Sequence, residues 1–230
     1  MPSGAEKTVF IWLVARNPGN LPPFATLIIC FTKHPQPCYC TKIFMAQIKP
    51  PQQVKLIVGM LSQLEEFFSA AEQEMSAQWG PIDIQSQVMV FDFTRYYQKQ
   101  MGDGLLRKFV SFVELIDPAE LAQAKHQSNA LENELAQTEA GRELAVARPI
   151  NLDPGYVEPS KLVLASTKNY SHRIYIGESI YAECTLQFHQ GKWESWPFTY
   201  PDYGSGKYDE FLTAVRGKLQ EQQLSQKPNT

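Results

Sequence analysis

Runs of apolar residues separated by polar turns predict a regular order of strands and helices from residue 54 onward. VKLIVGML at 54–61 is short and apolar, as is typical of a buried strand. Beyond it, apolar side chains recur every three or four residues, which predicts a helix that ends at Gly80 and Pro81. Second and third strands are expected across 84–93 and 105–115.

A second helix is predicted directly after the third strand. Asp117 and Pro118 are residue types that start helices, and Glu120 completes the pattern. An apolar stripe carries this helix to about Thr138. The order is then β-α-β-β-α, the start of a ferredoxin-like split βαβ, and residues 147–152 would supply its last strand beside the first.

The remaining chain predicts a mostly antiparallel sheet with a C-terminal hairpin and a closing helix. The fold class expected for the whole is therefore α+β, a ferredoxin-like start that merges into this sheet. The expected elements are a turn-rich link at 151–156, a strand at 161–166, a hairpin of 173–176 with 180–188, a short strand at 193–196 and a helix at 208–220.

The register of that hairpin decides which residue faces Glu183. A two-residue type II′ turn at Gly177 and Glu178 would place His172 opposite Glu183. The hydrophobic pattern favours a three-residue loop, which makes Arg173 the neighbour of Glu183. Because a slip of one residue reverses every side chain, burial is the stronger criterion, and we favour the pairing of Arg173 with Glu183.

Composition sets the class of protein. The chain has 230 residues, 43% hydrophobic and 20% charged, which suits one large domain or two small ones. A net charge of −3 argues against a broad surface for duplex nucleic acid. No apolar run approaches the roughly 18 residues of a transmembrane helix. Four cysteines without a disulfide framework indicate the cytoplasm as the location.

Residues 1–44 differ from the rest in composition. They hold a single acid, Glu6, against four bases, and three of the four cysteines. The break favours a disordered leader or a mis-assigned upstream extension of a start at Met45, with a single α+β domain at 45–222 and a frayed tail at 223–230. Two alternatives are a signal or membrane anchor and a small metal site. The metal ligands would be Cys30, His34, Cys38 and Cys40.

The strongest candidate site is the polar stretch STKNYSHR at 166–173, between two predicted strands. Lys168 offers a point charge, Arg173 a fork for phosphate or carboxylate, and His172 a proton carrier. We therefore expect an anion pocket with His172 as the catalytic acid or base. In the alternative, Arg173 only pairs with Glu183 on an exposed sheet face, and its loss would cost less than about 1 kcal/mol.

Further ligand-binding candidates lie in turns and strand ends elsewhere in the chain. Together with His172, the aspartates among them could bind a metal, but aspartates that cap turns are commoner, so no metal is assigned and no cofactor is identified. These candidates are Asp92, Thr94, Asp153, Tyr156 and Asp202, with Tyr200 and Tyr203 close to the last.

Known catalytic motifs are missing. Gly204-Ser205-Gly206-Lys207 hints at a phosphate loop, but Tyr208 stands where a P-loop needs Ser or Thr, so a Walker A motif is excluded. The sequence also lacks G-x-G-x-x-G after a strand, G-x-S-x-G, H-E-x-x-H and a C-x-x-C pair.

Several segments between about Val54 and Gln222 resemble the uncharacterised bacterial family catalogued as domain of unknown function 4416. The resemblance implies no activity, and it stops short of residues 1–44. The matching segments are FDFTRYY, MGDGLLRKFVSF, LIDP, INLDPGY, KLVLASTKNYSHRIYIG, IYAECTL and TYPDY.

Two functions from different classes remain open. In the first, the protein binds a small anionic or nucleotide-like ligand, with chemistry at a phosphate or phosphodiester. In the second, it is a non-catalytic module that meets a protein partner through exposed aromatic side chains. Those side chains would be Tyr170, Tyr175, Tyr181 and Trp193.

Overall fold

The computed structural model describes residues 10–12, 28–30 and 48–226, and the chain divides into two compact units, 1–50 and 51–230. In the first unit, strands β1 (Phe10–Trp12) and β2 (Ile28–Cys30) pair antiparallel. The expectations of a disordered leader, an anchor or a metal site fall largely on residues outside those described and stay predictions.

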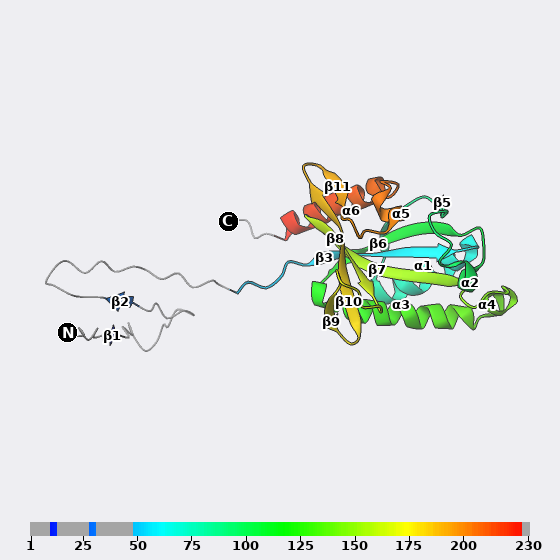
Figure 1. Ribbon diagram of the computed structural model, residues 1–230, viewed down its shortest axis with the longest axis horizontal. Coiled ribbons are helices and arrows are strands. Elements are labelled where there is room, and N and C mark those ends of the chain that lie inside the picture. Colours follow the sequence, from blue (N-terminus) through cyan, green and yellow to red (C-terminus); the bar gives the residue numbers. More distant parts are fainter. Residues whose placement is uncertain (1–9, 13–27, 31–47, 227–230) are drawn as a thin grey trace, which may run out of the picture. The chain divides into compact units, whose positions relative to one another are not determined.

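The second unit is built on a nine-stranded open sheet in which every pairing is antiparallel (Figure 1). Its strands are β3 (Val54–Ser62), β4 (Ile82–Gln85), β5 (Met89–Val90), β6 (Leu106–Ile116), β7 (Ile150–Glu158), β8 (Lys161–Ser166), β9 (Ile174–Gly177), β10 (Ile180–His189) and β11 (Lys192–Ser195). Their order is β11-β10-β8-β7-β3-β6-β4, with β9 paired to β10 and β5 paired to β6. The α+β fold class is confirmed, and β7-β3-β6-β4 is the expected split βαβ order.

Helices cover both faces of this sheet. The two longest before the C-terminal part, α1 and α3, share one core with the sheet, and α6 covers the other face (Figure 1). The helices are α1 (Glu65–Trp79), α2 (Gln98–Met101), the 3-10 turn η1 (Pro118–Glu120), α3 (Leu121–Ala136), α4 (Glu139–Glu143), α5 (Pro201–Gly204) and α6 (Asp209–Ser225). None of the helices described is long and apolar enough to cross a membrane.

The central strand β3 is buried along its whole length because both of its faces are covered. Leu56 and Val58 pack in the core with α1 and α3, and Ile57 packs in the core with α6. A strand that is buried on both faces has no polar side to show, which explains the unbroken apolar run in the sequence.

The helix starts and inward faces predicted from the sequence agree with the structure where they are most specific. Asp117 caps η1 with a complete capping box that includes Glu120, and η1 leads directly into α3. In α6 the expected inward side chains are all buried, and the helix continues to Ser225. They are Phe211, Leu212, Val215 and Leu219.

The expected turn-rich link at 151–156 was wrong, because those residues belong to strand β7. Each residue of the segment pairs with β3. Gly155 is required there for a packing reason, since a Cβ atom would lie 2.5 Å from the carbonyl oxygen of Val163 in β8. Gly155 therefore serves a close strand contact here and not a turn.

The β9–β10 hairpin resolves the question of register. Glu178 and Ser179 form a two-residue loop with φ of 50° and 62°, between the paired residues Gly177 and Ile180. A register shift after Ile180 then restores the pairing that burial favours. The loop is thus shorter than the three residues expected, yet the predicted neighbours do meet, because Arg173 Nε lies 2.9 Å from the carboxylate of Glu183.

Candidate functional site

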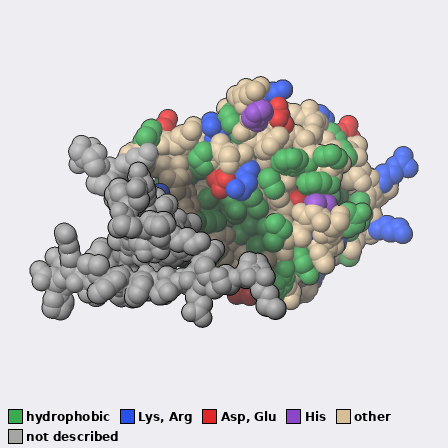
Figure 2. All heavy atoms as spheres, turned by 60° about the vertical axis from the view of Figure 1, so that its left-hand side comes forward, with side chains coloured by type: hydrophobic (Ala, Val, Ile, Leu, Met, Phe, Trp, Pro, Cys, Tyr) green, Lys and Arg blue, Asp and Glu red, His purple; other side chains and the backbone are tan. Residues whose placement is uncertain are grey.

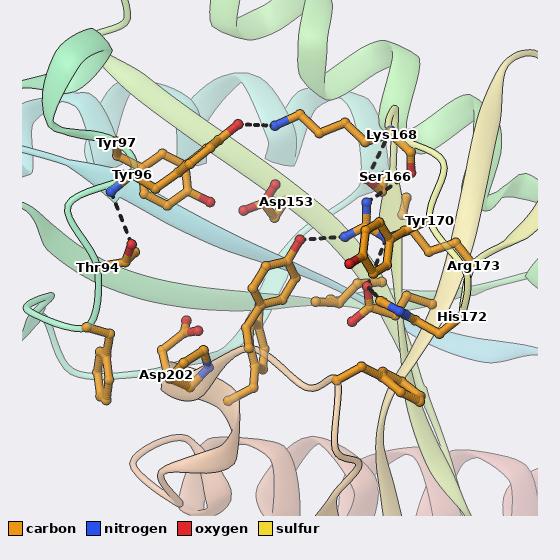
Figure 3. A pocket seen from close by; sticks show the side chains of 18 of the residues that line it. Thr94, Tyr96, Tyr97, Asp153, Ser166, Lys168, Tyr170, His172, Arg173 and Asp202 are labelled. Carbon is orange, nitrogen blue, oxygen red and sulfur yellow. Dashed lines mark hydrogen bonds and ion pairs between the residues drawn. The ribbon is translucent and has the colours of Figure 1, made fainter.

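A pocket of about 620 Å³ lies over the sheet where three loops meet (Figure 3). One wall is the segment after β5, the second is the β8–β9 connection, and the third runs into α5. The floor comes from β6, β7, β8 and β10. The residues that line the pocket include Tyr96, Arg107, Asp153, Lys168, Tyr170, His172, Arg173, Glu183, Phe198, Tyr200 and Asp202.

The floor of the pocket opens because β7 and β8 are paired along only part of their length. Their ladder starts at Gly155 and Leu164, whereas β8 continues to Ser166 with β10 as its partner. Pro154 directly precedes the ladder and has no peptide N–H to extend it. Asp153 therefore lies beyond the last β7–β8 pair and faces the pocket.

Asp153 occupies the middle of the pocket, between the Tyr96 side and the Lys168 side (Figure 3). Asn151 donates to its carboxylate at 2.6 Å, and Lys125 Nζ from α3 lies at 3.4 Å. Burial opposes the charge, but the cations Lys125 and Arg107 together with the Asn151 hydrogen bond lower the pKa of Asp153 below its ordinary value. The pocket thus holds a stable negative charge at its centre.

Arg107 forms the buried cationic part of the floor. Its Nη2 donates to Asp202 at 3.1 Å, and four aromatic rings lie within 5.9 Å of its guanidinium carbon. Gly59 leaves room for this group, since a Cβ atom there would lie 3.1 Å from Nη1. Nε and Nη1 are buried and have no hydrogen-bond partner among the described residues. Two nitrogens of this guanidinium, which carry three N–H groups between them, are therefore unsatisfied, a costly arrangement for a charged group.

Glu183 organises the wall made by the β8–β9 connection. Its carboxylate lies 2.9 Å from both Arg173 Nε and His172 Nε2, and it is 2% exposed. Arg173 also donates to the carbonyl of Lys168 and to the hydroxyl of Tyr200. All three nitrogens of this guanidinium are therefore used within the protein, and its role is to brace the wall.

The ring of His172 is fixed by stacking as well as by Glu183. It lies parallel to the ring of Phe198 with centroids 4.2 Å apart, and Tyr170 meets it edge-on. Its Nδ1 atom is buried without a hydrogen-bond partner among the described residues. Such packing holds the imidazole in one orientation, as a proton carrier requires.

Lys168 reaches across the mouth of the pocket to the opposite wall (Figure 3). Its Nζ donates to the hydroxyl of Tyr96 and lies 4.7 Å from the centroid of that ring. The hydrogen bond and the charge of Lys168 lower the pKa of Tyr96. This ammonium group therefore already favours negative charge at the mouth.

The structure brings together most of the candidates named from the sequence. Thr94, Asp153, Lys168, His172, Arg173 and Asp202 all line the pocket.

Asp92 and Tyr156 do not line the pocket, so the structure does not bring them together with the other candidates. Asp92 is exposed and pairs with Lys207 at 3.7 Å. Tyr156 lies three residues after Asp153 on the same strand, so its side chain points to the opposite face. It packs there against the start of α3.

Trp193 was expected to be an exposed contact for a partner, and it is 8% exposed instead. Its indole nitrogen donates to Thr213 in α6, and Phe188 packs on its ring. The residue belongs to the core under α6.

Sequence reasoning missed Arg107 as a site residue. The signal was present, because apolar residues occupy both alternating faces of the strand around Arg107, as in a central strand covered on both sides. An arginine in such a strand must be buried, and a buried arginine needs a specific partner. Nothing in the sequence pointed to that partner, Asp202, which is 95 positions away.

Among the described residues, no three histidine, cysteine, aspartate or glutamate side chains are grouped so that they could hold a metal ion. On the face drawn in Figure 2, hydrophobic side chains gather near the centre and charged ones of both signs are scattered around them. This face presents no broad field of one sign among the residues coloured there.

The comparison with protein families identifies the chain. Residues 52–219 match the family described as Domain of unknown function (DUF4416). The chain belongs to this family. No curated protein and no solved structure matches it. The description of this family names no activity.

Proposed function

We propose that this DUF4416 protein binds a small anionic, nucleotide-like ligand in the pocket. The observation that carries the proposal is the buried guanidinium of Arg107, a residue of the pocket lining with two buried nitrogens that have no hydrogen-bond partner among the described residues. A ligand whose acceptor oxygens entered the floor beside this group would satisfy them. The volume of about 620 Å³ is within the usual range for small-molecule sites.

The cationic contacts in this proposal differ from those expected from the sequence. Arg173 spends its donors on Glu183, Lys168 and Tyr200, so it supports the wall of the site. Lys168 and Arg107 are the cations of the pocket lining that still have N–H groups free to donate to a ligand. Lys168 is exposed at the mouth and Arg107, paired with Asp202, is buried in the floor, so between them they offer hydrogen-bond donors at both depths.

The aromatic side chains favour a ligand with a flat ring. Phe198 already stacks on one planar group, the imidazole of His172, and Tyr170 and Tyr200 are exposed beside it. Bases stack on such side chains at about 1–3 kcal/mol each, largely without regard to sequence. A nucleotide combines a flat ring with an anionic group, and both features have counterparts in this pocket.

Chemistry at a phosphate or phosphodiester would use His172 as the acid or base. Glu183 orients the ring through Nε2, and Nδ1 is the buried nitrogen without a partner, which a ligand seated against the ring would have to reach for proton exchange. Replacement of His172 by Gln would then abolish turnover of a phosphate ester or phosphodiester substrate, while the Kd for the ligand changed little. Equal turnover by His172→Gln and the parent protein would remove the catalytic role and leave binding in place.

The binding proposal is tested by thermal shift and calorimetry with inorganic phosphate, nucleoside monophosphates and cyclic mononucleotides. Ligands that bind the native state raise the Tm. Lys168→Ala should weaken binding by about tenfold, the equivalent of one lost charged contact. Lys192→Ala is the matched control, because Lys192 is an exposed lysine outside the pocket that pairs with Glu194. If none of these ligands raises the Tm, or if both variants weaken binding equally, the proposal fails.

A second candidate function, a protein-interaction surface, is favoured by one observation. Strand β9 exposes apolar side chains, with Ile174 72% and Tyr175 59% exposed. Replacement of both by Ser should abolish association with a partner in extracts of the native host while Lys168→Ala retains it. Association that survives the double replacement would contradict this function.

A further inference from the structure

The charged groups in and directly behind the pocket are almost completely paired with one another. Three ion pairs account for six of them, which makes this part of the pocket neutral overall. They are Arg107 with Asp202 at 3.1 Å, Arg173 with Glu183 at 2.9 Å, and Lys125 with Asp153 at 3.4 Å.

Lys168 is the one remaining cation of the pocket lining. None of the ion pairs between described residues includes it, and its ammonium group is held by the phenol of Tyr96. Apart from His172, the pocket and its supporting residues therefore carry a surplus of a single positive charge. This surplus is located at the mouth, where a ligand enters.

The three carboxylates limit how much negative charge the pocket can accept. Asp153 lies in the middle of the space between the walls (Figure 3), and Glu183 and Asp202 also line it. Each carboxylate repels a ligand anion, and the repulsion grows with the charge of that anion. Burial makes the effect stronger, because Glu183 and Asp202 are 2% and 4% exposed and water screens them little.

We infer that the ligand of this pocket is a singly charged anion on a flat ring system, such as a phosphodiester or a carboxylate, and not a terminal phosphate or a polyphosphate. The inference rests on the proposed function and specifies the class of ligand. Both groups spread one charge over two acceptor oxygens, which suits the single unpaired ammonium group of Lys168. A second negative charge would find no free cation in the pocket.

The test is a series of ligands that share a ring and differ in charge. Binding to the full chain at pH 8 is compared for a nucleoside, its cyclic mononucleotide, its 5′-monophosphate and its triphosphate, which carry zero, one, two and more negative charges. The cyclic mononucleotide should bind about tenfold more tightly than either the nucleoside or the monophosphate. Benzoate serves as a probe for a carboxylate source.

Two variants should shift the ligand charge that the pocket prefers in opposite directions. Asp153→Asn keeps the shape and removes one negative charge, so the ratio of monophosphate to cyclic affinity should rise about tenfold. Lys168→Gln removes the surplus charge, so the nucleoside should approach the affinity of the cyclic mononucleotide. Asp92→Asn is the control, since Asp92 lies outside the pocket and its loss changes only the total charge. Ratios within one variant do not depend on the folded fraction.

Each outcome decides a separate point. Tighter binding of the monophosphate or triphosphate by the parent protein overturns this inference and leaves the proposed function standing. Binding of benzoate alone supports the singly charged class with a carboxylate as its source, and overturns the nucleotide part of the proposed function. Failure of the whole series to bind overturns both. If Asp92→Asn raised the ratio of monophosphate to cyclic mononucleotide affinity as much as Asp153→Asn, the effect would come from the overall charge of the protein. That result would overturn the inference.

Discussion

Arg107 in β6 and Asp202 in α5 form a buried ion pair, with 3.1 Å between Nη2 and Oδ2. The pair joins the sheet to the last wall of the pocket. Tyr208 donates to the same carboxylate oxygen at 3.2 Å, so Asp202 holds both the arginine and the start of α6 in place. An isolated charge at this depth would be costly, which makes the pair a sensitive point of the fold.

Asp202→Asn is expected to destabilise the protein by about 3–5 kcal/mol, because it leaves the guanidinium of Arg107 buried without a counter-charge. Replacement of Arg107 by Met in the same chain should recover part of that loss. Urea unfolding of both single variants and the double variant measures the coupling. Strictly additive losses would show that the two residues do not stabilise each other.

Gly59→Ala is expected to destabilise the protein by about 1–3 kcal/mol and to weaken ligand binding. The new Cβ atom would lie 2.8 Å from the ring of Phe109 and 3.1 Å from Arg107, so both side chains must move. Gly217→Ala in α6 is the matched control. Nothing lies within 4 Å of a Cβ atom there, and the exchange should stabilise the helix by about 0.5–1 kcal/mol. Equal unfolding midpoints for the two variants would contradict this account.

Arg173→Ala is expected to cost about 3–5 kcal/mol, and not the value below about 1 kcal/mol typical of a surface pair. The reason is burial, since the side chains of Arg173 and Glu183 are 7% and 2% exposed. Lys192→Ala, which breaks an exposed pair with Glu194, should cost less than about 1 kcal/mol. Chemical denaturation compares the two, and a small loss for Arg173→Ala would mean that water replaces its contacts.

Asp153 should contribute stability that depends on pH. Its pKa is lowered in the folded protein, so the contribution is present above the unfolded value of about 3.9 and is lost as the pH falls toward the folded pKa. Asp153→Asn should therefore differ from the parent protein most at neutral pH and least once the pH has fallen below the folded pKa. The measurement is the free energy of unfolding from pH 7 downward. A difference that stays constant with pH would exclude this role.

Local signals in the sequence predicted most of the elements of the fold. Asp117 and Pro118 mark a helix start by chemistry that acts within a few residues, and the apolar stripe of α6 needs only its own periodicity. The link at 151–156 failed for the opposite reason. Pro154 and Gly155 have strong turn propensity, but pairing with β3 and the close approach of Val163 override it, and both partners are distant in the chain.

The candidate site was predictable only in part. Lys168, His172 and Arg173 are neighbours in sequence, and their polar stretch stood out between two strands. The use of each side chain was not predictable, because it depends on contacts made across the fold. Arg173 is occupied by Glu183 and Tyr200, whereas Arg107, which looked like one residue of an alternating strand, has nitrogens to spare.

The short ladder between β7 and β8 has a mechanical consequence. Four residue pairs join these strands, against eight between β7 and β3, so the sheet consists of two parts with a narrow seam between them. A narrow seam resists twisting less than a wide one, and the pocket lies over its open end. We therefore expect the two parts of the sheet to rotate slightly relative to each other about the β7–β8 ladder. A molecule bound across the open end of that ladder would contact both parts and restrict this motion.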